Sequence, residues 1–578
     1  MDRLKYILVA ALAISCQQIS FAQKSNSITE LNEIDKKINE SIYITTNANS
    51  FLTGETLFYK LFCIDKSTNA AKNFSKVAYA ALVDSNKKIV FTHKLFLENG
   101  AGNGDFFIPT TLETGNYKLI GYTNWMLNKN ASGFFNIDIY IVNPYKEESN
   151  TTVASNELAS LESVTDSNIS FDFKTKTYNN RDQIELGINA NSEEFTKGNY
   201  TLSVRKTDGF LSQNKTNFKE LPAENLSRNS NLQIDNTNFI FPELRGEIIS
   251  GKISSATGDI KNKKVALSVI GKNYYLKLAK TDDLGRFIFN LEKPNSSSNI
   301  VVQVVEDNEK EYTVEIDKTK NIDLSNLNFP SLQFNSEFKK NITERLIASQ
   351  IENAYYNVKK DSTLNSNDSI PFYGNLSTEF KLDAFTRFPT MEETITEVVK
   401  GVVYRKVKND YFIHIYDYDP NYESTLPALV VVDGLIIKDL NELFKYNPKN
   451  MYKINIVRGV YYYGAKSFNG LISFTTKNGD YETKLKGNFI IRPELLRPQA
   501  KKEYFQPDYS TNKSLRIPDY RHQLVWMPKV DLNNSKSKIT FYASDVSGKF
   551  EIILEGFSAT GKPVYIKDFI EIKKSDLN

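Results

Sequence analysis

Short hydrophobic runs separated by polar turn clusters dominate residues 42–142. Runs rich in Val, Ile, Phe and Tyr are interrupted at 84–86 (Asp-Ser-Asn) and 99–104 (Asn-Gly-Ala-Gly-Asn-Gly). Strands that recur every 8–12 residues with turn residues between them are typical of a β-sandwich. Similar runs near 183–188 and 198–206 predict a second sandwich segment after a polar stretch rich in Ser, Thr, Asn and Glu.

A third strand-rich region follows, with runs at 244–253 and 264–270. It continues into the sequence Asp282-Asp283-Leu284-Gly285, which precedes a run that begins near Phe287. An Asp at the first position of such a turn accepts backbone N–H groups, and a Gly at the last tolerates positive φ. The pattern therefore predicts a small β-sandwich with a tight turn between two of its strands.

Residues 336–356 show the period of an amphipathic helix. Their apolar side chains recur at helical spacing and build one stripe, formed by Phe338, Ile342, Leu346, Ile347, Ile351 and Ala354. Ser336 is placed to cap the first turn, and Glu337 suits the positive end of the helix dipole. We therefore expect a helix whose apolar stripe packs on a neighbouring domain.

The region 382–480 combines strands with glycine-containing turns. A run of β-branched residues at 429–432 ends in Asp433-Gly434, and a second run at 454–457 ends in Arg458-Gly459. A loop containing Tyr463, Gly464 and Gly470 then leads to a third run that ends in Thr476-Lys477. Buried strands ending at an Asp-Gly turn predict an α+β block, and runs at 539–545 and 550–556 predict a final hairpin.

The fold class that follows is mainly β and multidomain, with tandem β-sandwiches before a helical connector, an α+β domain and a C-terminal β unit. The predicted segments are a sandwich at 23–145, a linker at 146–168, a second sandwich segment at 169–243, a third sandwich at 244–320, a helical connector at 321–375, the α+β block at 376–490, and a C-terminal linker and β unit at 491–578.

The first 22 residues have the features of an export signal. Arg3 and Lys5 precede a nine-residue apolar run at 6–14, which is too short to span a bilayer as a helix. Small residues at 20 and 22 predict cleavage after Ala22. The sequence Ala-Ile-Ser-Cys at 13–16 also resembles a degenerate lipobox, so lipidation of Cys16 is the alternative.

Charge and composition exclude several classes of function. The 578 residues include 72 Lys and Arg against 69 Asp and Glu, a net charge of +3 that predicts no nucleic-acid partner. Only 3 His and 2 Cys are present, and His93, His414 and His522 show no metal-ligand spacing. We therefore predict no catalytic residue, no cofactor and no metal site.

Three stretches resemble known families. Residues 112–126 look like the second macroglobulin-type (MG2-like) domain of long Bacteroidota proteins, and 244–287 resembles a carboxypeptidase regulatory-like domain, which has no peptidase chemistry. The block around 382–480 is similar to the plug domain of TonB-dependent outer-membrane receptors. The residues that carry this last match are Asp433, Gly434, Arg458, Gly459, Tyr463, Gly464, Gly470, Thr476 and Lys477.

A receptor plug lies inside a 22-stranded barrel, which needs at least ~200 residues of strand. Residues 481–578 are too few for it, so the resemblance implies a plug-like module without a barrel. It implies a non-catalytic envelope protein, at the periplasmic face of the outer membrane, with a role in TonB-dependent transport or envelope assembly. The implied partner is an outer-membrane β-barrel or another envelope protein, and membrane association comes from that partner or from a lipid on Cys16.

Two other functions remain open from the sequence. One is a surface-exposed adhesive or ligand-binding protein in which the sandwiches bind. The other is a hydrolase, whose catalytic residues need not be adjacent in sequence.

Overall fold

The computed structural model describes residues 28–129, 133–146, 162–207, 239–330, 339–364, 371–374, 376–418, 425–464, 466–511, 516–532 and 536–574. The predicted signal segment 1–22, Cys16 and the helix cap at Ser336 lie outside these residues. The chain divides into two compact units. Unit 1 comprises residues 1–244, 321–363 and 501–578, and unit 2 comprises residues 245–320 and 364–500.

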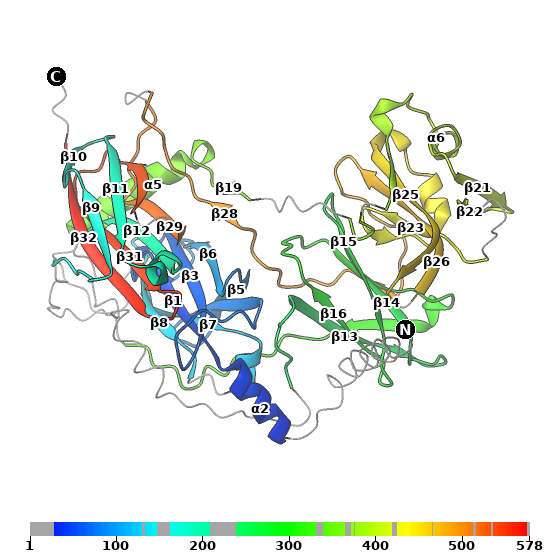
Figure 1. Cartoon of the computed structure of the whole chain (residues 1–578), viewed down its shortest axis with the longest axis horizontal. Coiled ribbons are helices and arrows are strands. Elements are labelled where there is room, and N and C mark those ends of the chain that lie inside the picture. The colour runs from blue at the N-terminus through cyan, green and yellow to red at the C-terminus, as the bar shows by residue number, and fades with distance from the viewer. Residues whose placement is uncertain are drawn as a thin grey trace, which may run out of the picture. The chain divides into compact units, whose positions relative to one another are not determined.

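The first sandwich of unit 1 packs an antiparallel sheet and a mixed sheet around one core (Figure 1). One sheet has the order β1-β3-β6 and the other β2-β8-β7-β4-β5, in which β2 runs parallel to β8. Helix α2 (Ile28–Ile38) precedes them. The strands are β1 (Glu40–Thr46), β2 (Ser50–Leu52), β3 (Thr56–Asp65), β4 (Val77–Val83), β5 (Ile89–Phe96), β6 (Ala101–Phe107), β7 (Gly115–Tyr122) and β8 (Asn136–Val142).

The second sandwich of unit 1 is built from two distant parts of the sequence. Its sheets have the orders β10-β32-β31-β12-β29 and β30-β11-β9. The strands are β9 (Ile169–Phe173), β10 (Thr177–Asn179), β11 (Gln183–Ala190), β12 (Asn199–Lys206), β29 (Gln523–Val530), β30 (Lys536–Tyr542), β31 (Gly548–Phe557) and β32 (Pro563–Lys573). A short helix, α3 (Glu193–Thr196), joins β11 to β12.

This arrangement differs from the linear order of segments that the sequence indicates. The segments 169–243 and 491–578 share one sandwich, because β12 lies between β29 and β31 and β11 lies beside β30. Strand β12 is buried along nearly its whole length, so it needs neighbours on both sides. The C-terminal strands supply them.

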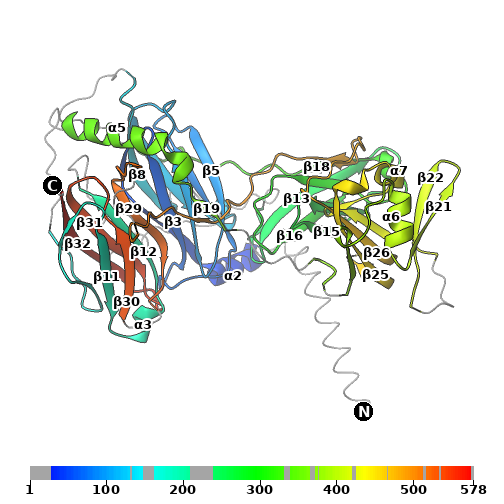
Figure 2. The ribbon, with the colours of Figure 1, turned by 90° about the horizontal axis from the view of Figure 1, so that it is seen from above.

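Helix α5 (Lys339–Ala354) lies over the first sandwich near β8 (Figure 2). Ile342 and Leu346 pack against Leu52 and strand β8, as the apolar stripe predicts. Ile347 from the same stripe is 49% exposed, and the buried side chains of the helix are Arg345 and Ala348. The predicted packing of the apolar stripe is therefore only partly confirmed. The buried Arg345 pairs with Glu55, and this ion pair also orients the helix.

Unit 2 begins with a small sandwich. Its sheets have the orders β16-β13-β18 and β15-β14-β17-β27. At the turn after β15, the Asp282 carboxylate accepts the Leu284 and Arg286 N–H groups, and Gly285 has φ 72°, as the sequence predicts. The strands are β13 (Glu247–Ser255), β14 (Lys264–Val269), β15 (Tyr275–Lys280), β16 (Arg286–Leu291), β17 (Ile300–Val304), β18 (Tyr312–Ile316) and β27 (Ile490–Ile491).

The second part of unit 2 is an α+β block. Its sheet has the order β20-β25-β26-β23-β24, and a separate hairpin is formed by β21 and β22. The elements are β20 (Thr378–Lys381), α6 (Met391–Val398), β21 (Val402–Val407), β22 (Asp410–Ile415), β23 (Leu429–Val432), β24 (Leu435–Ile436), α7 (Leu440–Phe444), β25 (Met451–Tyr463) and β26 (Lys466–Thr476).

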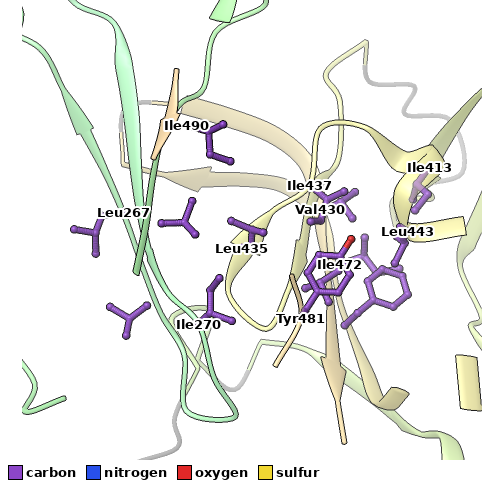
Figure 3. Packing of buried hydrophobic residues seen from close by; sticks show 14 of the residues in the cluster. Leu267, Ile270, Ile413, Val430, Leu435, Ile437, Leu443, Ile472, Tyr481 and Ile490 are labelled. Carbon is purple, nitrogen blue, oxygen red and sulfur yellow. The ribbon is translucent and has the colours of Figure 1, made fainter. Parts of the chain in front are cut away.

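One hydrophobic core spans both parts of unit 2. Figure 3 shows Leu267 and Ile270 from the small sandwich on one side of Leu435, and Val430 and Ile472 from the α+β block on the other. Because a shared core couples the packing of both parts, the plug-like block is not an independent module.

These sheets confirm a mainly β, multidomain fold with β-sandwiches and an α+β block. Among the described residues, no helix is both long enough and apolar enough to cross a membrane.

Candidate interaction site

Asp433 and Thr476 are two plug-like residues that the fold brings into contact. Asp433 and Gly434 have φ values of 48° and 89° and form the tight turn between β23 and β24. The buried Asp433 carboxylate accepts the Thr476 N–H at 2.8 Å, the Thr476 hydroxyl at 2.6 Å and the Tyr481 N–H at 3.1 Å. The pKa of Asp433 is raised because burial outweighs these hydrogen bonds. The contacts tie this turn to the end of β26.

Two plug-like glycines lie opposite each other in the β25–β26 pair. The register shifts between Val457 and Val460, so β25 carries a bulge that includes Gly459 with φ 81°. Gly470 has φ 76°, and a Cβ added there would lie 2.6 Å from the Val457 carbonyl oxygen. Positive φ favours glycine at both positions, and the close approach adds a second reason at Gly470.

Tyr463 and Gly464 face the small sandwich of unit 2. The Tyr463 hydroxyl donates to the Leu276 carbonyl on β15, and a Cβ at Gly464 would lie 2.8 Å from the Cβ of Leu278. Lys477 is exposed at the end of β26, and no contact joins its side chain to the other plug-like residues. The motif thus organises the packing within unit 2 and does not converge on one site.

Arg458 connects the motif to an exposed aromatic side chain. It donates to the Lys400 carbonyl at 3.2 Å, and its guanidinium lies 5.4 Å from the centre of the Tyr418 ring. A guanidinium over an aromatic face is attracted by the ring. Arg458 therefore supports Tyr418 in an outward position, where 71% of this residue is exposed.

Four exposed aromatics, Phe412, Tyr416, Tyr418 and Tyr462, form what we call the aromatic set. In β22 the side chains alternate, with Ile413 and Ile415 buried and Phe412 outward. Tyr416 follows this alternation, and the exposed Tyr462 lies near the end of β25. Sequence reasoning missed these residues. With Ile413 and Ile415 inward, the period of two in β22 places Phe412 and Tyr416 outward, whereas no local pattern marks Tyr462.

Two of the three histidines, His93 and His522, are partly buried. The His93 Nδ1 lies 2.7 Å from the Tyr59 hydroxyl, and its ring stacks on Phe91 at 4.0 Å. Burial lowers the pKa of His93 to about 4. Burial, together with Arg345, Lys206 and Arg205, lowers the pKa of His522 to about 3. Both imidazoles are neutral at pH 7.

His414 lies on the outward side of β22, beside Tyr416. Within the residues that the structure describes, no group of three or more His, Cys, Asp or Glu side chains is placed to hold a metal ion. The Cys63 thiol is buried, and it donates to Glu40 across 3.7 Å.

A buried ionic cluster lies beneath α5 in unit 1. Arg345 Nε donates to Glu55 Oε1 at 2.9 Å, its Nη2 donates to the Ser50 carbonyl at 3.0 Å, and Arg205 Nη2 lies 3.7 Å from Glu55 Oε2. Burial raises the pKa of Glu55, but the two guanidiniums and the Leu52 N–H outweigh it and hold the pKa at about 2. The cluster anchors the helix on the first sandwich.

Comparison with known proteins gives no family assignment. No family model matches the chain, and no curated protein matches it. The native alpha-2-macroglobulin of Escherichia coli shares 9% identity over 93% of this chain and 40% of its own, with a TM-score of 0.23. Salmonella alpha-2-macroglobulin reacted with methylamine shares 7% identity over 92% of this chain and 23% of its own, with a TM-score of 0.16. The chain spans less than half of the length of either protein.

Proposed function

We propose that the protein is a non-catalytic component of the cell envelope that docks on a partner through the aromatic set of unit 2. The partner is an outer-membrane β-barrel protein. The observation that carries this proposal is the outward exposure of Phe412, Tyr416, Tyr418 and Tyr462 on a block whose sequence resembles a receptor plug. Exposed aromatic side chains are enriched where proteins associate.

The non-catalytic part of the proposal rests on the surroundings of the candidate catalytic groups. His93 and His522 are partly buried and neutral, and the Cys63 thiol is enclosed beside Glu40. A nucleophile or general base must reach its substrate. These positions support structural roles.

The signal-like segment 1–22 supports export of the protein. We place its site of action at the periplasmic face of the outer membrane. A role in TonB-dependent transport or envelope assembly would follow from the identity of the barrel partner. Protease treatment of intact cells tests the location, because only a surface-exposed adhesin would be cleaved.

Purification of the tagged full-length protein from detergent-solubilised outer membranes tests the partner. We expect a β-barrel protein to co-purify and to be lost from a Phe412→Ser/Tyr416→Ser variant. A matched Ile288→Ser/Leu284→Ser variant changes exposed apolar residues of the small sandwich and serves as the control. Recovery of no barrel protein, or equal loss from both variants, would contradict the proposal.

A further inference from the structure

A hollow of about 450 Å³ lies in the α+β block of unit 2, between the start of α6 and the segment that follows α7. Its lining comes from Pro389, Thr390, Glu392, Phe444, Lys445, Tyr446, Asn447 and Lys449. A volume of this size is within the range of small-ligand pockets. The plug-like residues do not line it, so it is distinct from the motif.

The hollow has an apolar side that is held in place by ring packing. Phe444 stacks on Tyr411 at a centroid distance of 4.0 Å and an angle of 7°, and the Tyr446 ring lies 5.5 Å from that of Tyr481. Phe444 is buried and Tyr446 is half-buried, so both rings are restrained. Pro389 adds a further apolar surface. These rings suit a flat apolar group.

Its charged side is cationic. Lys445 and Lys449 are exposed, and no carboxylate pairs with either ammonium group among the described residues. The one acid that lines the hollow is Glu392, whose Oε1 accepts the Tyr411 hydroxyl at 2.6 Å. Glu393 is occupied in the capping box with Thr390. The hollow is therefore lined by two exposed lysines and by one carboxylate that already accepts a hydrogen bond.

The segment that bears the lysines is fixed before any ligand arrives. Arg387 donates to the carbonyls of Pro448 and Met451 at 3.2 and 2.8 Å, and Asn447 Oδ1 accepts the Lys449 N–H at 3.0 Å. Restraint of the backbone reduces the conformational entropy that binding would otherwise cost.

We propose that this hollow binds a phosphate group carried on an apolar body. The ammonium groups of Lys445 and Lys449 contact the phosphate oxygens, and the body packs on Phe444 and Tyr446. Charge-assisted hydrogen bonds to a phosphate are among the stronger contacts that lysine makes. The phosphate comes from a soluble phosphate ester or from a phospholipid headgroup.

Calorimetric titration of the full-length protein with phenyl phosphate and with inorganic phosphate tests the proposal. We expect saturable binding of phenyl phosphate, and weaker binding of inorganic phosphate because it lacks the ring. A Lys445→Ala/Lys449→Ala variant should bind phenyl phosphate about tenfold or more weakly. A Lys272→Ala/Lys293→Ala variant, which changes exposed lysines elsewhere in unit 2, should bind it like the original protein.

Vesicles of phosphatidylcholine with and without phosphatidylglycerol identify the source of the phosphate. If the protein is retained on phosphatidylglycerol vesicles and phenyl phosphate releases it, the phosphate comes from a lipid headgroup. If the protein binds phenyl phosphate but is not retained on the vesicles, the phosphate comes from a soluble ester. Absence of saturable binding to any of these probes would overturn the proposal. Equal weakening in the two lysine variants would also overturn it, because the attraction would then be non-specific.

Discussion

Two enclosed carboxylates, Glu55 in unit 1 and Asp433 in unit 2, are stabilised in opposite ways. Glu55 in unit 1 is paired with two guanidiniums, and its pKa is held at about 2. Asp433 in unit 2 receives only uncharged donors, and its pKa is raised. Burial alone therefore does not set the direction of these two pKa shifts, and the two guanidiniums beside Glu55 account for the difference.

The regions around Glu55 and Asp433 also differ in the groups that they expose to solvent. The Glu55 cluster anchors α5 on the first sandwich, so it is part of a rigid scaffold. The Asp433 turn belongs to the block that exposes the aromatic set and the unpaired lysines of the hollow. The Glu55 cluster thus stabilises the fold internally, whereas the aromatic set and the two lysines of the hollow are exposed to solvent.

Removal of Arg345 should produce the largest effect. Arg345→Ala leaves Glu55 buried with only the more distant Arg205 nearby, so we expect unit 1 to lose about 3–5 kcal/mol of unfolding free energy. Urea denaturation measures this change. Lys340→Ala on the exposed side of the same helix is the control, and equal losses would show that the ion pair does not anchor the helix.

Acidification should have the second largest effect, a loss of stability in unit 1. The folded pKa of His522 is about 3 against about 6.5 when unfolded, so below pH 6.5 the unfolded state binds a proton that the native state excludes. We expect a loss of about 2–3 kcal/mol between pH 6.5 and pH 4. His522→Gln should reduce this pH dependence of the unfolding free energy across the same range, and an unchanged pH dependence would contradict a native state that keeps this imidazole neutral.

Asp433→Ala should have a smaller effect in unit 2. The change leaves the Thr476 hydroxyl and two N–H groups without their acceptor, at a cost of about 1–3 kcal/mol. Asp307→Asn, an exposed position of the same unit, should be neutral. Chemical denaturation that shows the two variants to be equally stable would rule out a structural role for the turn.

The aromatic set should contribute least to stability. Tyr416→Ser/Tyr462→Ser changes exposed side chains, so we expect the unfolding free energy to shift by less than about 0.5 kcal/mol. Thermal denaturation provides the measurement. A large loss would mean that these rings are part of the fold and are not free for a partner.

Local features of the fold could be predicted from the sequence, and long-range pairings could not. The turns at Asp282–Gly285 and Asp433-Gly434 depend on a few adjacent residues, whose conformational preferences are strong. The position of β12 between β29 and β31 joins residues more than 300 apart, and no local pattern specifies that choice.

The same limit applies to the candidate sites. A helical stripe indicates which residues of α5 are apolar, but the burial of Arg345 depends on Glu55, which lies in another part of the chain. The hollow likewise combines Thr390 with Lys445 and Lys449, which come together only in the folded block. In the aromatic set, Phe412 and Tyr416 follow the period of two in β22, but Tyr462 comes from β25 and joins them only through the fold.

Site-specific photo-crosslinking in the outer-membrane fraction tests the central claim most directly. A photoreactive residue is placed at Tyr416 in the aromatic set, or at Ile288 on the small sandwich, which is also exposed. We predict an adduct with a β-barrel protein from position 416 and none from position 288. Absence of an adduct at 416, or equal adducts at both positions, would contradict docking through the aromatic set.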